Sequence, residues 1–384
     1  MYNLCILTSH FYPIKSSCSS LFKDLIKSLL KNDNIKITVI TISGTKKKIK
    51  TINTRKITYV GIKNLHLQSS KKYSRAIGDI LAILKLRNFY KKNNFPKFDQ
   101  VLVYSPSIFW GIILFALKKK FVSIKLGDLY PKWLIDHKII NKFSINFLVL
   151  KFFEIFLYLQ ANKIYVQTEK DVSYISKYEK LLNFKTSVLY NWIRTENIVS
   201  NKYIKKNPKI IRFIFVGVIG VAQDYKLLYK MIKFCNDKNY KSVFYFIGSG
   251  TKKKKLIELT SNFKNVFFYP EMHISKLDET IKKVDVCIST LIKDFKSDNF
   301  PGKILRYMVN NKPIISHSPN NNFLEKLIKN NSLGVFSSNE KELFSNIEYI
   351  FSDFDSFKKK GSDGLNIAKK FFSTEYAKEI ILKK

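Results

Sequence analysis

A short apolar run, a turn and a helix-forming segment follow one another repeatedly along this chain of 384 residues. Near the start, Leu4–Thr8 is an apolar run, Leu21–Leu30 has apolar residues at helical spacing, and Ile37–Ile42 is strand-like again. The pattern restarts with the run Ile210–Gly217, and helical spacing follows over Tyr225–Cys235. Strands that alternate with helices predict an α/β fold with parallel, Rossmann-like sheets.

A polar, basic stretch without periodicity separates the two halves of this pattern. It runs from Glu196 to Pro208, and the chain is long enough for a hydrophobic core on each side of it. We therefore expect an N-terminal domain over residues 1–196, a linker over 197–208 and a C-terminal domain over 209–372. Residues 373–384 are expected to form a terminal helix.

The most informative stretch begins at Asp298. Pro301 and Gly302 mark a loop, and proline suits the first turn of a helix because its φ is fixed and it lacks an N–H. From Lys303 the apolar residues recur at helical spacing, and Ile314–Ser316 reads as a buried strand. Because a helix N-terminus offers unpaired N–H groups and partial positive charge, this segment predicts a phosphate site with Lys303 at its edge.

This segment resembles the donor-binding segment of retaining GT-B glycosyltransferases of family 4, which assemble bacterial capsule, O-antigen and exopolysaccharide. The usual form in that family is Pro-Ser-Lys-Ile/Leu-x-Glu-Tyr-Met, followed by Gly-Lys-Pro-Ile/Val. The matching residues are Pro301, Lys303, Ile304, Tyr307, Met308, Lys312, Pro313 and Ile314. Arg306 stands where the family has the glutamate that holds the nucleotide ribose, and Asp298 stands at the acidic position eight residues earlier.

The resemblance covers the chain from Leu7 to Leu382 and implies a GT-B fold. In that fold two Rossmann-like domains face a central cleft, and the C-terminal helix crosses back to the first domain. A nucleotide diphosphate sugar is the implied co-substrate, with no cofactor and no metal. Lys303 is then a catalytic candidate, because a cation offsets the charge that grows on the departing diphosphate.

Asp128 is the second catalytic candidate that the resemblance implies. The segment Asp128-Leu-Tyr-Pro131 looks like the Asp-Leu-Trp-Pro segment of the same family. A carboxylate after a strand of an α/β domain can orient an acceptor hydroxyl or stabilise cationic character at the sugar. The alternative is that Asp128 only caps the next turn.

Glycine-containing and small-residue turns supply the remaining donor-site candidates. Gly217, Gly220 and Gln223 resemble the family segment Gly-Asn-x-Gly-x-x-Gln-Gly, and glycine allows the backbone to approach a ligand closely. The predicted nucleotide-sugar ligands are Gly217, Gly220, Gln223, Asp298, Pro301, Gly302 and Arg306. Ser16 and Ser17 lie where relatives place a glycine-rich loop and form a candidate phosphate loop, with an ordinary surface loop as the alternative.

The formal net charge of +39 is extreme for a chain of this length. One explanation is attraction to an anionic membrane surface, nucleic acid or a phosphate-rich substrate. The other is a compositional bias that raises Lys, Asn, Ile, Phe and Tyr together. Nucleic acid is disfavoured as a partner, because the lysines are scattered and no zinc-finger, RNP-type or helix-turn-helix signature accompanies them.

Cysteine and histidine positions argue against a metal site. The four cysteines lie far apart without a CxxC pair, and the five histidines show no metal-binding spacing. We interpret the histidines as surface or loop residues. The chain begins with an apparent strand rather than a signal peptide, and the cysteines suit a reducing compartment, so we expect a cytoplasmic protein, peripheral on the inner face of the plasma membrane.

Two apolar stretches bear on membrane contact. Ile108–Leu117 is too short to span a bilayer, which needs ~20 residues. A buried helix is expected there, with insertion into a membrane interface as the alternative. Phe143–Leu159 contains Lys151 and Glu154, which argues against a spanning helix.

Together these observations predict a retaining, metal-independent glycosyltransferase. It would move a sugar from a UDP-sugar or another nucleotide diphosphate sugar to a lipid-linked or saccharide acceptor in bacterial surface polysaccharide biosynthesis. The first alternative is a catalytically impaired relative that binds a partner or glycan, suggested by Arg306, Ala222 and Lys132, which replace residues usual in the family. The second is a general polyanion or nucleic-acid binder.

Overall fold

The computed structural model describes residues 1–384 except 12, 15, 16, 45, 47, 65–71, 106, 137, 197, 199–208, 294–299 and 384. The chain divides into two compact units. Unit 1 consists of Met1–Asn191 together with Thr374–Lys384, and unit 2 consists of Trp192–Ser373. The stretch expected to be a linker, 197–208, lies outside the described residues except for Ile198.

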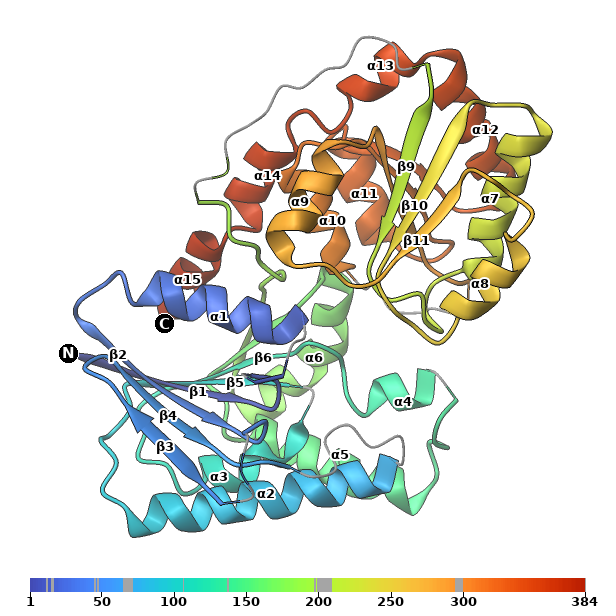
Figure 1. The fold of residues 1–384 in the computed structure, drawn as a ribbon. Helices are drawn as coiled ribbons and strands as arrows, with labels where there is room; N and C mark the ends of the chain where they lie inside the picture. Colours follow the sequence, from blue (N-terminus) through green and yellow to red (C-terminus); the bar gives the residue numbers. More distant parts are fainter. Residues whose placement is uncertain are drawn as a thin grey trace. The chain divides into compact units, whose positions relative to one another are not determined.

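Unit 1 is built on an eight-stranded sheet in the order β3-β4-β2-β1-β5-β6-β7-β8 (Figure 1). The strands are β1 (Tyr2–Thr8), β2 (Ile35–Thr41), β3 (Lys50–Asn53), β4 (Ile57–Gly61), β5 (Gln100–Tyr104), β6 (Val122–Lys125), β7 (Lys163–Val166) and β8 (Lys185–Val188). Neighbouring strands are parallel, except that β3 pairs antiparallel with β4. The central strand β1 places Leu7 opposite Ile40 of β2 and Val103 of β5.

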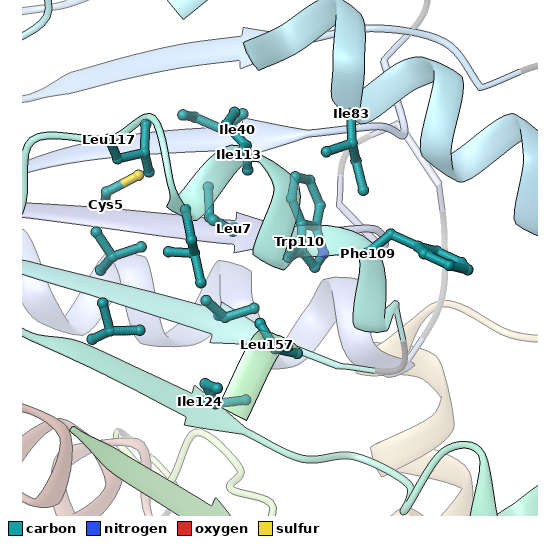
Figure 2. Close-up of a cluster of buried hydrophobic side chains, with 14 of the residues drawn as sticks. Cys5, Leu7, Ile40, Ile83, Phe109, Trp110, Ile113, Leu117, Ile124 and Leu157 are labelled. Carbon is teal, nitrogen blue, oxygen red and sulfur yellow. The ribbon is translucent and has the colours of Figure 1, made fainter. Parts of the chain in front are cut away.

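Helices cover both faces of this sheet. They are α1 (Ser17–Leu29), α2 (Lys72–Lys92), the 3-10 helix η1 (Ile108–Trp110), α3 (Gly111–Leu114), α4 (Lys132–Asp136), α5 (Ile145–Tyr158), α6 (Glu169–Leu182) and α15 (Thr374–Leu382). Figure 2 shows the core on one face, where Ile83 of α2, Trp110 and Ile113 lie over Leu7 and Ile40 of the strands. α5 adds Leu157 to the same core.

The apolar run Ile108–Leu117, predicted as one helix, is divided between η1 and α3. Its side chains at Ile108, Trp110 and Ile113 are no more than 1% exposed, so they belong to the core and not to a membrane interface. None of the helices in the described ranges has both the length and the apolar content that a bilayer span requires. The edge strand β3 was not predicted, because its four residues are all exposed and carry one large apolar side chain, Ile52.

The helix α15 packs within unit 1, although most of the chain before it belongs to unit 2. The Ser28 hydroxyl of α1 donates to Glu375 Oε1 at 2.8 Å. From the sheet, the Tyr165 hydroxyl donates to the Ile380 carbonyl and the Gln100 amide donates to the Ile381 carbonyl, both at 2.9 Å. The expected return of the C-terminal helix to the first domain is therefore confirmed.

Unit 2 is built on a six-stranded, fully parallel sheet in the order β11-β10-β9-β12-β13-β14 (Figure 1). The strands are β9 (Ile211–Val216), β10 (Ser242–Ile247), β11 (Val266–Tyr269), β12 (Val286–Thr290), β13 (Ile314–His317) and β14 (Gly334–Ser337). This is the order of a Rossmann sheet, with the first strand of the unit in the middle.

Helices lie on both faces of the second sheet as well. One face is covered by α7 (Tyr225–Asp237), α8 (Lys253–Leu259), α12 (Glu340–Ser352) and α13 (Phe354–Lys359). The remaining helices are α9 (Ile274–Lys282), α10 (Gly302–Val309), α11 (Asn322–Asn330) and α14 (Gly364–Phe371). The strand–turn–helix repeat predicted for both halves is confirmed.

Candidate functional site

The chain order of unit 2 reverses between β9 and β12. From β9 the chain continues to β10 and β11 on one side, whereas β12, β13 and β14 lie on the other. The loops that leave the carboxyl ends of β9 and β12 therefore run in opposite directions. Open α/β sheets bind ligands at such a reversal, outside the carboxyl ends of the strands. The residues after Val216 and after Thr290 are thus the place to look for a site.

Tyr307 fixes helix α10 to this reversal point. Its hydroxyl donates to the Ile288 carbonyl of β12 at 3.1 Å and accepts the Val216 N–H of β9 at 3.0 Å. The side chain is fully buried. A buried hydroxyl that is satisfied on both sides is costly to displace, so the N-terminal turn of α10 is held at a fixed position over the strand ends.

Two glycine turns form the floor of the same region. Gly217 has φ +110°, Gly248 has φ +141° and Gly250 has φ +133°, all in the region that favours glycine. A Cβ on Gly248 would lie 2.1 Å from the Gly217 carbonyl oxygen, and one on Gly250 would lie 2.3 Å from the Ile219 carbonyl oxygen. The two turns pack backbone against backbone, which leaves peptide groups rather than side chains at the strand ends.

Lys303 places its amine directly over this floor. The Nζ atom lies 3.5 Å from the centre of the Phe215 ring, and a Cβ on Gly217 would lie 4.0 Å from it. The amine is buried and makes no hydrogen bond within the described part of the chain. Burial lowers the pKa of Lys303 to about 7. Among the described residues no carboxylate offsets this effect.

An amine in this position is destabilised in its charged form until an anion reaches it. Moving a cation from water into the protein interior costs roughly several kcal/mol when no opposite charge lies beside it. An opposite charge recovers much of that cost. The start of α10 is open to a ligand, because Gly302 is exposed and a Cβ on it would meet no atom of the described residues within 4 Å. Pro301 precedes α10 and Gly302 is its first residue, and no side chain of the described residues caps this helix N-terminus. The geometry suits a phosphate group.

Gln223 holds the turn that follows Gly217. Its Oε1 atom accepts the Gly220 N–H at 3.2 Å, and Asp224 next to it caps α7 by accepting the Leu227 N–H at 2.9 Å. The structure therefore brings Gly217, Gly220, Gln223 and the start of α10 together, as the predicted set of ligands requires.

Arg306 points toward α9. Its guanidinium lies 3.1 Å from Asp278 Oδ2, and Asn310 donates to Asp278 Oδ1 at 3.0 Å. A role for Arg306 as a direct nucleotide ligand would require this ion pair to open.

Three predicted positions fall outside the description. Asp298 and Ser16 lie outside the described residues, as does the side chain of Ser17, the first residue of α1.

Unit 1 has its own polar group at the carboxyl edge of its sheet. Lys125, the last residue of β6, is fully buried, and its Nζ lies 3.4 Å from the Leu126 carbonyl. Tyr104 is its neighbour on β5, and the Tyr104 hydroxyl lies 3.2 Å from the Cys18 thiol. Burial lowers the pKa of Lys125 to about 7, although Asp171 and Asp128 act in the opposite direction.

Asp128 lies in the loop after β6 and is exposed. Its charge acts on Lys125 and also helps to raise the pKa of Tyr104, for which burial is the larger cause. The structure thus places Asp128 at the edge where α/β units bind ligands, beside a lysine and a tyrosine.

Sequence reasoning missed Lys125 and misjudged one histidine. The alternation of Val122 and Ile124 with Ser123 and Lys125 gives no signal for this burial, because it predicts an exposed polar face, whereas all four residues of β6 are buried. His317 is not a surface or loop residue: it ends β13, is 4% exposed, and its Nδ1 lies 3.2 Å from the Ser337 hydroxyl. Within the described residues no three His, Cys, Asp or Glu side chains converge as metal ligands would.

Comparison with known proteins identifies the fold to which this site belongs. The segment 196–361 matches the family model "Glycosyl transferases group 1". The matched segment lies within unit 2, and the solved structures described next show that the fold is GT-B. The predicted fold class is thereby confirmed. No curated protein matches the sequence.

Solved structures resemble the chain over nearly its whole length at low identity. The sucrose-phosphate synthase of Thermosynechococcus elongatus has TM-score 0.71 and 11% identity, covering 100% of this chain and 98% of that one. WaaG, a glycosyltransferase involved in lipopolysaccharide biosynthesis, has TM-score 0.68 and 10% identity, covering 99% and 100%. Anabaena HepE, solved with UDP and glucose, has TM-score 0.66 and 12% identity, covering 100% and 99%. At these identities the likeness establishes the GT-B fold alone.

Proposed function

We propose that this GT-B protein is an active glycosyltransferase whose unit 2 binds the diphosphate of a nucleotide sugar at Lys303. The observation that carries the proposal is the buried Lys303 amine, which has no hydrogen-bond partner in the described residues and lies over a glycine turn at the reversal of the Rossmann sheet. The matching family domain includes this residue.

Lys303 would act on the leaving group. When the bond from the anomeric carbon to the diphosphate breaks, negative charge grows on the phosphate oxygens. A cation already fixed near them stabilises that charge more than it stabilises the substrate, which is how such a group accelerates transfer. The backbone N–H groups of the 217–220 turn and of the α10 N-terminus would bind the same oxygens. Charge compensation by the lysine is consistent with transfer that needs no metal ion.

The donor, acceptor and setting form the finer part of the proposal. The donor is a UDP-sugar, supported by the similar fold of HepE, which was solved in complex with UDP and glucose. The acceptor is lipid-linked or a saccharide, transfer retains the anomeric configuration, and the pathway assembles bacterial surface polysaccharide, for which WaaG offers a parallel. Asp128 orients the acceptor hydroxyl. The protein acts in the cytoplasm, at the inner face of the plasma membrane.

A panel of nucleotides tests the first step. Calorimetry with UDP, GDP and ADP should show one preferred diphosphate, and the corresponding sugars should then support transfer to a membrane-extract acceptor. If no nucleotide diphosphate binds the wild-type protein, the assignment of Lys303 fails.

A catalytically impaired relative is the second candidate, and the Arg306–Asp278 ion pair favours it. Arg306 replaces an acid that in the resembled family holds the ribose, and here the guanidinium is engaged by α9. An impaired relative would bind a nucleotide or a glycan and yet transfer no sugar from any donor in the panel.

A further inference from the structure

Helix α5 of unit 1 and the segment just before it expose a continuous apolar stripe. It consists of Phe143, Ile145, Leu148, Val149 and Phe152, whose exposed fractions are 87%, 78%, 60%, 48% and 63%. Within the helix the spacing is i, i+3, i+4 and i+7, so these side chains share one face. Apolar residues scattered singly over a surface are ordinary, whereas a clustered stripe of this size marks an interaction surface.

The opposite side of α5 is already used for folding. Leu157 is fully buried in the unit 1 core, and Leu150 and Phe153 pack against that core. The two charges of the helix are also turned away from the stripe: Lys151 pairs with the buried Glu154, and its amine lies 4.6 Å from the centre of the Tyr178 ring on α6. A helix that is apolar on both faces needs an apolar environment on both.

The outer face of α7 is built differently. On α7, the exposed Lys230 and Lys233 form ion pairs with Glu340 and Asp237 at 2.7 Å and 2.6 Å. Residues 143–150 contain no charged side chain, in a chain with 68 lysines and arginines. The composition of the whole protein therefore does not explain the stripe.

Two lysines precede the stripe in the sequence. Lys138 and Lys142 are exposed, and neither forms an ion pair within the described ranges. The nearby Asp136 does not neutralise them, because it pairs with Lys132. The segment between the lysines and the helix is well held, since the Ser144 hydroxyl caps α5 by accepting the Phe147 N–H at 3.2 Å. Apolar side chains are thus presented next to unpaired positive charge.

We propose that this stripe docks unit 1 on an anionic lipid bilayer. Its apolar side chains would enter the boundary between headgroups and acyl chains, with α5 lying in the plane of the interface, while Lys138 and Lys142 contact the anionic headgroups. A second copy of the chain is a less suitable partner for the stripe, because two molecules with a formal charge of +39 repel each other. An anionic bilayer, in contrast, attracts a molecule of this charge. In Figure 1, α5 lies on the face of the unit 1 sheet opposite α1 and α15. The proposal gives the lipid-linked acceptor of the proposed function a surface, but docking does not depend on catalysis.

Vesicle flotation of the full chain tests the proposal. Wild-type protein should float with phosphatidylcholine vesicles that contain one-third phosphatidylglycerol and bind vesicles of phosphatidylcholine alone about tenfold less, with binding to the anionic vesicles weakened by salt. The combined variant Phe143→Ser, Ile145→Ser, Leu148→Ser should lose about tenfold or more of that binding. The matched control is Leu181→Ser, Ile257→Ser, Leu259→Ser, three apolar residues exposed elsewhere, which should bind as wild type does.

Three further measurements separate the outcomes. Phe143→Asp lies outside α5 and leaves the helix intact, so it repeats the test if the combined variant unfolds. Nucleotide diphosphate binding by the stripe variants should equal that of wild type, so a failure of docking is distinct from a failure of the proposed function. The proposal is overturned if wild type ignores anionic vesicles, if the stripe variants bind them fully, or if sedimentation shows a wild-type dimer that the stripe variants abolish while vesicle binding is unchanged.

Discussion

Unit 1 buries Lys125 and unit 2 buries Lys303, each at the carboxyl edge of a parallel sheet. The pKa of each lysine is lowered to about 7 by burial. Around Lys125 the protein supplies opposing charge from Asp171 and Asp128, whereas among the described residues only burial acts on Lys303. In unit 1 the two carboxylates partly balance the charge of Lys125, so this environment suits a neutral ligand that bears hydroxyl groups. The environment of Lys303 has no counter-charge from the described part of the chain and suits an anion.

The largest effect should come from removing the uncompensated amine. Lys303→Ala should reduce kcat/KM for transfer by about 10³-fold, or roughly 4 kcal/mol of transition-state stabilisation, because no other side chain replaces its charge. The thermal midpoint should not fall, since the variant removes a buried amine that has no hydrogen-bond partner in the described residues. Lys254→Ala, an exposed lysine of α8, is the control and should have wild-type activity. Wild-type turnover by Lys303→Ala would reject the assignment.

Asp128→Asn should sharpen the contrast between the two units. We expect transfer to fall about 10²-fold, the usual contribution of a positioned carboxylate, while the Kd for nucleotide diphosphate stays within about twofold of wild type. Single-turnover kinetics and calorimetry measure the two quantities separately. A large loss of nucleotide affinity would show that Asp128 serves the donor rather than the acceptor.

The glycine floor of unit 2 should tolerate no side chain at Gly248. Gly248→Ala combines φ +141° with a Cβ 2.1 Å from the Gly217 carbonyl oxygen, so we expect a loss of about 2–3 kcal/mol in the free energy of unfolding. Gly302→Ala is the matched control: its Cβ meets no atom within 4 Å, and stability should be unchanged or slightly higher. Chemical denaturation checks both.

The pH dependence of nucleotide binding should report on Lys303. In the free protein the amine is protonated below pH about 7 and neutral above it. A bound diphosphate favours the protonated form, so binding takes up a proton above pH 7, and affinity should fall by up to about tenfold per pH unit as pH rises from 7 to 9. The phosphate, whose second pKa is ~6, stays ionised over this range. Lys303→Arg should give a flatter profile, and an identical profile would contradict the mechanism.

The smallest effect should come from the Arg306–Asp278 pair. The two side chains are 21% and 25% exposed, and a double-mutant cycle of Arg306→Ala with Asp278→Ala should give a coupling energy of about 0.5–1 kcal/mol. Nucleotide affinity of Arg306→Ala should change less than about threefold. A tenfold or larger loss would instead make Arg306 a direct ligand.

The fold could be predicted because it follows from the periodicity of apolar residues and from the order of strands and helices along the chain. Strands such as Ile211–Val216 are apolar throughout, as buried parallel strands must be, and their succession leaves few topologies open. The edge strand β3 could not be found in this way, because an exposed strand has no buried face to leave a pattern.

The site could be predicted only in part, because local sequence signals mark some of its residues and not others. Lys303 and Gly217 were recognised because turn and helix-start signals mark them. The isolation of the Lys303 amine and the pairing of Arg306 with Asp278 depend on side chains that are distant in sequence. The apolar stripe was hidden for the same reason, since the sequence does not say which side of α5 faces the core.

The position of α15 has a consequence for how this chain is made. On the ribosome, Met1–Asn191 emerges well before α15, so the Gln100 amide and the Tyr165 hydroxyl must wait for their acceptors at Ile381 and Ile380. Unit 2, which is continuous in sequence, emerges in full during that interval. The amino-terminal half of this protein is therefore the half that finishes folding last.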